Sequence, residues 1–230
     1  MINSVRNTVL AICNKNNYGY ISPSDFNLFA KQAQMDMFED YFYQYNYQIN
    51  KVNARTTGSS YANLAENLLE VIDSFSVFDA QLANPTINQY TLPADFYYVN
   101  RLQYNNLDVE KVSESKLLNL TNSLLTAPTI EFPAYVVRGN TAFIFPDTIT
   151  GLVIGCQYVR YPVDPIWGYV SLSSGEPMYD NGSSVDFELP ASDEPMLVVK
   201  ILQYAGISIR EMEVVNAMTT MEANENQQEQ

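Results

Sequence analysis

The chain of 230 residues contains no histidine, and this absence removes several classes of catalytic and metal site. Without imidazole there is no Ser-His-Asp or Cys-His catalysis and no zinc site with a histidine ligand. The two cysteines, Cys13 and Cys156, are too few for a four-cysteine zinc site and lie in unrelated patterns. Two buried free thiols are therefore expected, as in a reducing cytoplasm, with a single disulfide as the alternative.

Positive charge is also scarce, because 12 Lys and Arg stand against 26 Asp and Glu, for a net charge of −14. Tight binding of nucleic acid needs a basic face that neutralises phosphates, so it is not expected here. The acidity is explained either by solubility alone or by a surface that must lie near DNA without retaining it. From Tyr161 to Val199 the chain has seven acidic residues and no Lys or Arg. This pattern indicates a solvated acidic loop, with a specific electrostatic site as the alternative.

Long hydrophobic runs and a signal sequence are missing as well. No run reaches the roughly 18 apolar residues that a transmembrane helix needs, so no membrane span is expected. The start, MINSVRNTVLAICNKNN, lacks the basic region, apolar stretch and cleavage site of a signal peptide. Phosphate-loop, nucleophile-elbow and metal-loop motifs do not occur. The sequence therefore predicts no catalytic residue, no metal site and no cofactor.

Helical periodicity is present over residues 1–83, which predict an N-terminal helical bundle. Residues 2–14 place apolar side chains at spacings of three and four and predict a short helix. Ser22-Pro23-Ser24-Asp25 predicts a helix start, with a cap, an early proline and an early acid. One long helix is expected to follow to about residue 50 and another to cover about residues 60–80. We expect these two to pair antiparallel as a hairpin.

The helical spacing of apolar residues ends at Asn84-Pro85. Residues 84–170 predict a small, mostly antiparallel β module, either a sheet or a barrel. Asn105-Asn106 and Gly139-Asn140 are the expected turns of two hairpins. A short helix that begins near residue 113 and ends before Pro128 is expected to be inserted between strands. Strands are expected over residues 86–92, 96–104, 107–112, 134–138, 141–145 and 151–161.

Residues 171–230 are expected to hold an acidic loop, C-terminal helices and a docking tail. A last strand is expected over residues 185–189, and a helix is expected to start at Asp193-Glu194-Pro195 and to stop or kink at Ala205-Gly206. One more helix is expected over residues 207–221. The predicted fold class is α+β, with an N-terminal helical hairpin or bundle, a small, mostly antiparallel β module, and C-terminal helices with an extended tail.

Two segments have the features of interaction surfaces. The chain after Arg210 has no basic residue, and its methionines suit an irregular partner surface. Such an arm can order on binding, the alternative being a helix packed on its own domain. The second segment is the polar loop NARTTGSS, a candidate inter-subunit loop. The candidate docking residues are Ile207, Ile209, Met212, Val215, Met218 and Met221 in the arm, and Arg55, Thr56, Thr57 and Gly58 in the loop.

Two rival functions are open on the residues alone. The chain has 17 tyrosines, which bury a ring and keep a polar tip, and these favour a carbohydrate-binding or tail-fibre-associated module. A glycosidase would need paired carboxylates. The carboxylates in or near the β module have no diagnostic spacing; they are Asp95, Glu131, Asp147 and Asp164.

The order of several segments resembles the neck proteins of short-tailed bacteriophages. Helices are followed by LPADFYYVNRLQYNN, PAYVVRGNTAFIFPDTITG, YVRYPVDPIWGY and FELPASDEPMLVVKILQYAGISIRE. Over nearly the whole chain this order looks most like the structural ring proteins, or head–tail connectors, of crAss-like phages that infect gut Bacteroidales bacteria. It also resembles the gatekeeper or tail-tubular adaptors of other short-tailed phages in layout.

The resemblance implies a virion structural protein without enzymatic activity. Such proteins form homo-oligomeric rings, usually twelvefold, beneath the portal in the neck or tail, and are assembled in the cytoplasm of the bacterial host. The implied partners are the portal protein, adjacent neck or tail ring proteins, and genomic double-stranded DNA that passes through the lumen without tight binding. The C-terminal segment of this family often docks on the portal, which would give residues 207–230 that role.

Overall fold

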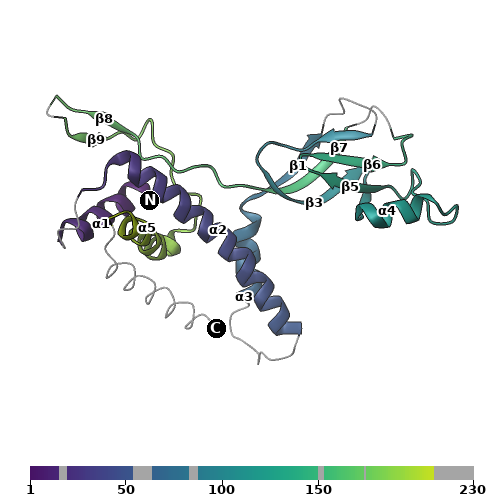
Figure 1. The fold of residues 1–230 in the computed structure, drawn as a ribbon, viewed down its shortest axis with the longest axis horizontal. Coiled ribbons are helices and arrows are strands. Elements are labelled where there is room, and N and C mark those ends of the chain that lie inside the picture. The colour runs from purple at the N-terminus through teal and green to yellow at the C-terminus, as the bar shows by residue number, and fades with distance from the viewer. Residues whose placement is uncertain (16–19, 54–63, 83–87, 150–152, 174, 210–230) are drawn as a thin grey trace. The chain divides into compact units, whose positions relative to one another are not determined.

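A computed structural model describes residues 1–15, 20–53, 64–82, 88–149, 153–173 and 175–209 (Figure 1). The mixed α+β class predicted from the sequence is confirmed. No helix in these ranges is both long enough and apolar enough to cross a membrane. In chain order the elements are α1 (Ile2–Lys15), α2 (Pro23–Asn53), α3 (Leu64–Asp73), β1 (Ser76–Leu82), β2 (Gln89–Thr91), β3 (Phe96–Tyr104), β4 (Leu107–Lys111), α4 (Glu114–Thr121), β5 (Ala134–Arg138), β6 (Thr141–Phe145), β7 (Ile154–Arg160), β8 (Tyr169–Ser171), β9 (Pro177–Tyr179), a 3-10 turn (Ala191–Asp193) and α5 (Glu194–Ile209).

The chain divides into two compact units. Unit 1 combines residues 1–71 with residues 162–230, so it is built from both ends of the chain. Unit 2 is the continuous stretch of residues 72–161. Negative charge is concentrated in unit 1, which has 18 Asp and Glu against seven Lys and Arg, whereas unit 2 has eight against five.

In unit 1, α1 and α2 both pack on α5. The predicted start of α2 is confirmed, because the Asp25 amide donates to Ser22 Oγ at 3.2 Å and the Phe26 amide donates to the Ser22 carbonyl at 2.9 Å. The predicted pairing of α2 with the next helix is not its main contact among the described residues, since α2 lies mostly against α5. The buried apolar residues of α2 and α5 include Phe26, Ala30, Ala33, Met37, Phe38, Leu197, Val198, Ile201, Leu202 and Ala205.

The helix expected over residues 60–80 was only partly correct. α3 ends at Asp73, and residues 76–82 form the edge strand β1. β1 pairs antiparallel with β7, for example Ser76 with Val159 and Leu82 with Ile154. The apolar spacing of this segment favours a helix, but the hydrogen bonds to β7, some 80 residues away, stabilise a strand instead. Local propensities are weak, and tertiary contacts commonly override them.

Unit 2 is a curled, mostly antiparallel sheet of seven strands in the order β1-β7-β3-β4-β5-β6-β2. Both predicted hairpin turns are confirmed: Asn105 and Asn106 have φ of 50° and 62°, and Gly139 has φ of 57°. The one parallel pair in this sheet, β4 with β5, has α4 inserted between its strands, as predicted for that helix. Parallel neighbours need such a crossover, which a two-residue turn cannot supply.

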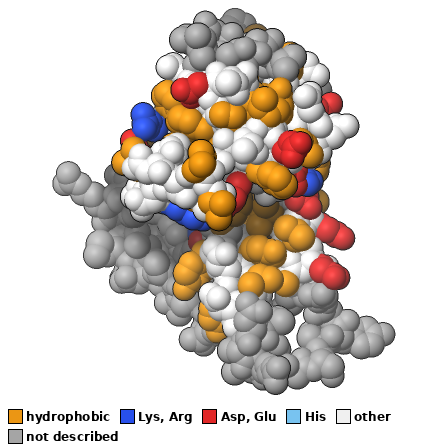
Figure 2. Space-filling view, turned by 90° about the vertical axis from the view of Figure 1, so that its right-hand side faces the viewer, with side chains coloured by type: hydrophobic (Ala, Val, Ile, Leu, Met, Phe, Trp, Pro, Cys, Tyr) orange, Lys and Arg blue, Asp and Glu red, His pale blue; other side chains and the backbone are white. Residues whose placement is uncertain are grey.

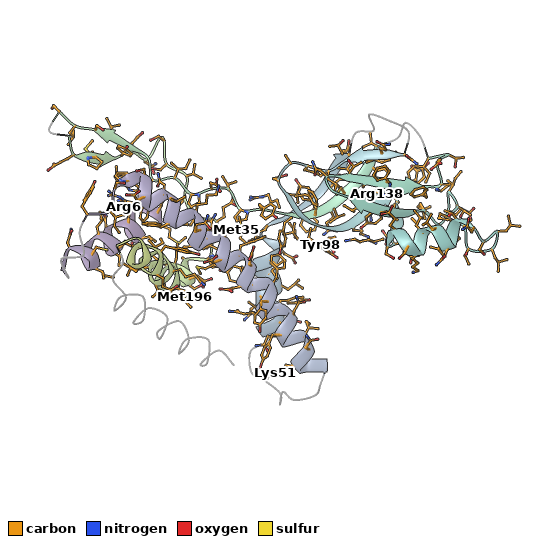
Figure 3. The ribbon with its side chains drawn as sticks, viewed as in Figure 1. Arg6, Met35, Lys51, Tyr98, Arg138 and Met196 are labelled. Carbon is orange, nitrogen blue, oxygen red and sulfur yellow. The ribbon has the colours of Figure 1, made fainter. Side chains whose placement is uncertain are left out.

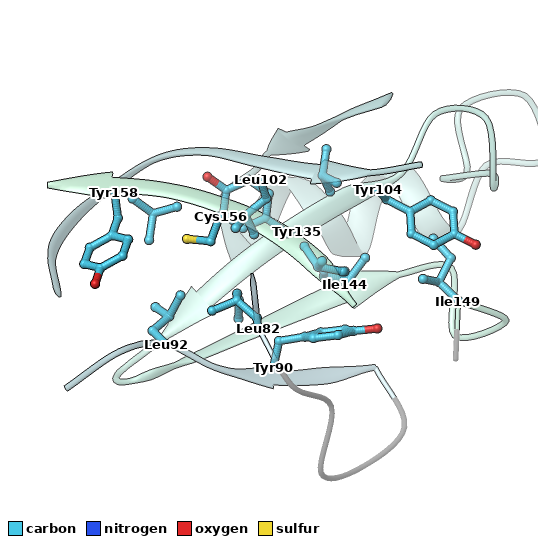
Figure 4. Close-up of a cluster of buried hydrophobic side chains, with 14 residues drawn as sticks. Leu82, Tyr90, Leu92, Leu102, Tyr104, Tyr135, Ile144, Ile149, Cys156 and Tyr158 are labelled. Atoms are coloured by element: carbon cyan, nitrogen blue, oxygen red, sulfur yellow. The ribbon is translucent and has the colours of Figure 1, made fainter. Parts of the chain in front are cut away.

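A cluster of buried hydrophobic side chains fills the curl of unit 2 (Figure 4). It takes side chains from all seven strands and includes Tyr135, Ile144 and Cys156, each 1% exposed or less. Burial raises the pKa of Cys156 to about 11 and also raises the pKa of Cys13 in unit 1. Both cysteines are buried free thiols, as the sequence predicted.

The segment after β7 departs from the predictions in two places. The strand expected over residues 185–189 is reduced to a single bridge between Val185 and Ile166. α5 begins at Glu194 as predicted, but it continues through Ala205-Gly206 to Ile209. A helical glycine costs only about 1 kcal/mol relative to alanine, and Ala205 is 2% exposed in the core, so burial outweighs the cost. The helix expected beyond this point lies outside the described residues.

Candidate docking surfaces

Trp167, the single tryptophan of the chain, is the anchor of a hairpin in unit 1. Its side chain is 2% exposed. Its indole Nε1 donates to Asn3 Oδ1 on α1 at 3.1 Å, and its amide donates to Asn27 Oδ1 on α2 at 2.8 Å. The ring is therefore oriented by two helices that the sequence separates from it by some 140 residues or more.

Arg6, which lies on α1 (Figure 3), covers one face of this ring. Its guanidinium carbon lies 3.7 Å from the indole centroid, a cation–π contact, and the side chain is 5% exposed. Burial lowers the pKa of Arg6, and a hydrogen bond from the guanidinium to Tyr20 opposes that shift. Arg6 Nε is buried without a hydrogen-bond partner. The indole ring and Tyr20 both contact the guanidinium, so Arg6 is held in place over Trp167.

The β8–β9 hairpin rests on Trp167 with one of its two faces. Tyr169 and Tyr179 are cross-strand partners, and each ring centroid lies 5.8 Å from that of Trp167. Successive side chains on a strand point to opposite faces, so Val170, Leu172 and Met178 lie on the other face. They are 54%, 44% and 54% exposed. We call these three residues the outer face of the hairpin; it is apolar and open to solvent.

Gly168 permits the close approach that completes this anchor. A Cβ at this position would lie 2.2 Å from Ser183 Oγ and 2.6 Å from the Ser183 carbonyl carbon. The Gly168 amide donates to Ser184 Oγ at 3.0 Å, and the Asp180 amide donates to the Gly168 carbonyl at 3.0 Å. The position therefore excludes any side chain. Apart from the glycine itself, nothing in the sequence indicated that the backbone of residue 183 lies so close.

Unit 2 carries a second apolar surface, formed by α4 and the segment that follows it. Leu117 turns inward and is 5% exposed, whereas the apolar side chains that turn outward are strongly exposed. Figure 2 views the end of unit 2 at which α4 lies in Figure 1, and hydrophobic side chains are visible on that surface. We call the outward set the leucine knob: Leu118 (62% exposed), Leu124 (104%), Leu125 (96%), Ile130 (52%) and Phe132 (77%).

Backbone hydrogen bonds link the residues of the leucine knob segment beyond α4. The Ala127 amide donates to the Ser123 carbonyl at 2.9 Å, and Thr129 and Phe132 exchange amide-to-carbonyl bonds, both of 3.2 Å. An ordered backbone lowers the entropic cost of binding, because the segment need not be fixed on contact. The sequence predicts a helix that reaches almost to Pro128, but α4 ends at Thr121, so Leu124 and Leu125 lie beyond the helix.

Two cations on α4 and β5 are engaged in surface ion pairs. Arg138 on β5 pairs with Glu114, and Lys116 lies 3.5 Å from Glu110 (Figure 3). All four side chains are about half exposed or more. Surface pairs of this kind contribute about 0–1 kcal/mol, so they exchange partners at little cost.

The structure does not describe the side chains of the docking residues predicted from the sequence. Ile207 and Ile209 lie in the last turn of α5, but their side chains are outside the description. The rest also fall outside it: Met212, Val215, Met218 and Met221, and the loop residues Arg55, Thr56, Thr57 and Gly58. These assignments therefore stay predictions.

The candidate carboxylates do not form a shared site within the described chain. Asp95 accepts a hydrogen bond from Tyr158 at 3.1 Å, and Asp147 accepts one from Asn88 at 2.5 Å. Glu131 is exposed beside the leucine knob. Asp164 belongs to unit 1, where it pairs with Lys31 at 2.6 Å. Among the described residues, no group of three or more acidic or cysteine side chains is placed to hold a metal ion.

Comparison with known proteins adds no relative to this picture. No protein-family model matches the chain, and a search of curated proteins finds no significant match. The functional argument therefore rests on the two apolar surfaces and on the charge of the chain.

Proposed function

We propose that the chain is a virion structural protein that forms a ring-shaped head-to-tail adaptor beneath a phage portal, with a DNA channel in its lumen. The layout of the sequence resembles that of crAss-like neck ring proteins. One observation of the structure supports the proposal most directly: each unit has its own exposed apolar surface, the outer face of the hairpin in unit 1 and the leucine knob in unit 2.

Two different surfaces on one chain are what a ring needs. A heterologous contact, in which one surface meets a different surface of the next copy, generates a ring when the rotation closes. A symmetric dimer, by contrast, uses the same surface on both copies. The net charge of −14 suits a channel through which DNA passes without being retained.

The rival function, a carbohydrate-binding or tail-fibre-associated module, has weaker support. Sugar binding typically uses aromatic rings gathered at one site together with convergent polar groups. The three most exposed tyrosines among the described residues instead come from separate segments: Tyr43 lies on α2, Tyr20 precedes α2, and Tyr98 lies on β3, at 72%, 65% and 49% exposure. A glycan array separates the two functions, since an adaptor gives no specific signal.

The direct test is negative-stain imaging of the purified chain mixed with the portal of the same phage. We expect rings seated on the portal. Deleting residues 210–230 should abolish portal binding and leave the fold intact, as measured by circular dichroism, if the arm docks there. Persistent monomers with no portal binding by the full chain would overturn the proposal.

A further inference from the structure

The turn that follows β9 contains a pair of residues with intrinsic covalent reactivity. Asn181 is followed by Gly182, the single Asn-Gly pair in the chain, and both residues are exposed. Glycine has no Cβ to shield its amide nitrogen, so that nitrogen can attack the side-chain carbonyl carbon of the preceding asparagine. We infer that Asn181 is a site of spontaneous deamidation, and that the carboxylate of Asp180 restrains the reaction while the chain is folded.

The reaction consumes only water besides the two residues. The Gly182 amide gives its proton to hydroxide, and its nitrogen then forms a bond to Asn181 Cγ. The bond from Cγ to Nδ2 breaks, and the side-chain nitrogen leaves as ammonia with a proton from water, which regenerates the hydroxide. Water opens the resulting succinimide ring at either carbonyl, so that aspartate or isoaspartate stands at position 181. The net change replaces an NH2 group by OH, without oxidation or reduction.

The folded turn holds the attacking nitrogen. The Gly182 amide donates a hydrogen bond to Asp180 Oδ1 at 3.0 Å. Loss of the amide proton would leave a negatively charged nitrogen beside this carboxylate, and two like charges in contact are unfavourable. Asp180 therefore opposes the first step of the reaction.

A carboxylate at this distance could instead act as a general base, and its proton affinity decides between the two roles. Hydrogen bonds from the Ser183 hydroxyl and from the Gly182 amide lower the pKa of Asp180. A carboxylate whose pKa lies below that of an ordinary aspartate takes almost no proton from an amide at neutral pH. The electrostatic restraint is therefore the larger effect.

The carbonyl group that would be attacked is already oriented. The Tyr179 hydroxyl donates to Asn181 Oδ1 at 3.1 Å, and a donor at this oxygen can stabilise the oxyanion that attack would create. The turn itself is held by two further bonds: the Asp180 amide donates to the Gly168 carbonyl at 3.0 Å, and the Ser184 hydroxyl donates to the Asp180 carbonyl at 2.6 Å. The restraint thus lies at the nitrogen and lasts as long as the turn stays folded.

Deamidation would act on the anchor of the β8–β9 hairpin. Aspartate at position 181 adds a negative charge next to Asp180, in a stretch from Tyr161 to Val199 that has no Lys or Arg. Isoaspartate adds a methylene to the backbone of a turn so close to Gly168 that a Cβ there would lie 2.6 Å from the carbonyl carbon of Ser183. Either product would loosen the packing of this turn, so the site is a slow and irreversible release of the hairpin.

Peptide mapping by mass spectrometry tests the inference on the full chain, incubated at mildly alkaline pH in buffer and in urea. The rate in urea divided by the rate in buffer measures the protection that the fold gives, and it cancels differences in intrinsic reactivity between variants. For the wild-type chain we expect aspartate and isoaspartate at position 181, formed about tenfold or more faster in urea, the factor for one hydrogen bond to a charged group. Asp180→Ala should remove most of this protection.

Ser183→Ala is the matched control. It removes the bond to Asp180 Oδ2 at 2.6 Å but leaves the bond between Oδ1 and the Gly182 amide, so the protection should persist. Gly182→Ala should slow the reaction in urea as well as in buffer, because its Cβ shields the attacking nitrogen. Asp180→Asn keeps an acceptor for the amide without the charge and should also lose protection; it decides the question if Asp180→Ala disturbs the fold, which the emission of Trp167 reports.

The inference is independent of the proposed function, and its failure would leave the adaptor proposal standing. An Asn181 that stays unmodified in urea would overturn the site itself. Equal rates in buffer and in urea for the wild-type chain would overturn the restraint. Protection retained by either Asp180 variant with its fold intact, or lost equally in Ser183→Ala, would show that the Asp180 carboxylate is not its source.

Discussion

At the scale of single residues, the tightest constraint in unit 1 is the absence of a side chain at position 168. Gly168→Ala should destabilise the chain by about 1–3 kcal/mol, the range for forcing extra atoms into a filled space. The added Cβ would meet the Ser183 backbone, which cannot move aside as a flexible side chain does. Thermal unfolding gives the stability, and the emission of the single tryptophan reports the environment of Trp167.

Gly182→Ala is the matched control for that substitution. Its Cβ would come no closer than 3.4 Å to Asp180 Oδ1, at the edge of ordinary van der Waals contact, so little change is expected. If Gly168→Ala and Gly182→Ala lowered the stability equally, the close approach of Ser183 would not be what constrains position 168.

Asp186 is a second residue with a specific prediction. Burial raises the pKa of Asp186. The Met1 amine at 2.9 Å and the amides of Ile2 and Phe187 together lower it by more than burial raises it, so the pKa lies below the ordinary value. A carboxyl whose folded pKa is depressed stabilises the fold above its unfolded pKa, near 3.9, and loses this contribution as pH falls through the folded value. Asp186→Asn should therefore reduce the loss of stability below about pH 4, measured by urea unfolding at several pH values. An unchanged pH profile would contradict this.

At the scale of elements, polar pairs connect α2 to α5 and to the 3-10 turn before it, in antiparallel order. Lys200 is 5% exposed and lies 2.9 Å from Asp40, while Tyr204 donates to Asp36 and Tyr41 donates to Asp193. Such pairs fix the register of two helices whose apolar faces alone allow several. The long α2 stripe of aromatic and apolar residues predicted a buried face, but its partner helix is more than 100 residues away in the chain.

This interface allows a comparison of two substitutions. Lys200→Met keeps the volume and removes the buried charge, so it should be close to neutral. Asp40→Ala removes one carboxylate partner of a buried ammonium and should cost about 1 kcal/mol or more, discounted because Asp40 is half exposed. Urea unfolding of both variants measures the difference. A larger loss for Lys200→Met than for Asp40→Ala would contradict this expectation, because it would show that the Lys200 ammonium stabilises the fold by more than its pairing with Asp40.

At the scale of the whole molecule, the charge distribution gives a prediction about DNA. With a net charge of −14 and 18 acids in unit 1, the chain should not retain double-stranded DNA at physiological salt. A gel-shift series over increasing salt checks this, with a basic DNA-binding protein as the positive control. Binding that weakens steeply with salt would reveal a basic surface that the described residues do not form.

Elements with local signals were predicted well from the sequence. Ser22 caps α2 through its own neighbours, and Gly139 supplies the positive φ that its hairpin turn requires. Sites that depend on distant partners were missed. The β8–β9 hairpin lies in a stretch rich in Gly and Pro, and it exists because Trp167 is held by Asn3, Arg6 and Asn27 from the opposite end of the chain.

The sequence by itself determined the α+β class, the order of most elements, the acidity and the absence of histidine chemistry, because each depends on composition or on neighbours along the chain. Only the tertiary structure decided that both ends of the chain form one unit, that residues 76–82 become an edge strand, and that Leu124, Leu125 and Val170 face solvent. The physical reason is that exposure is set by which distant segments pack against a side chain, and apolar spacing alone does not specify those segments.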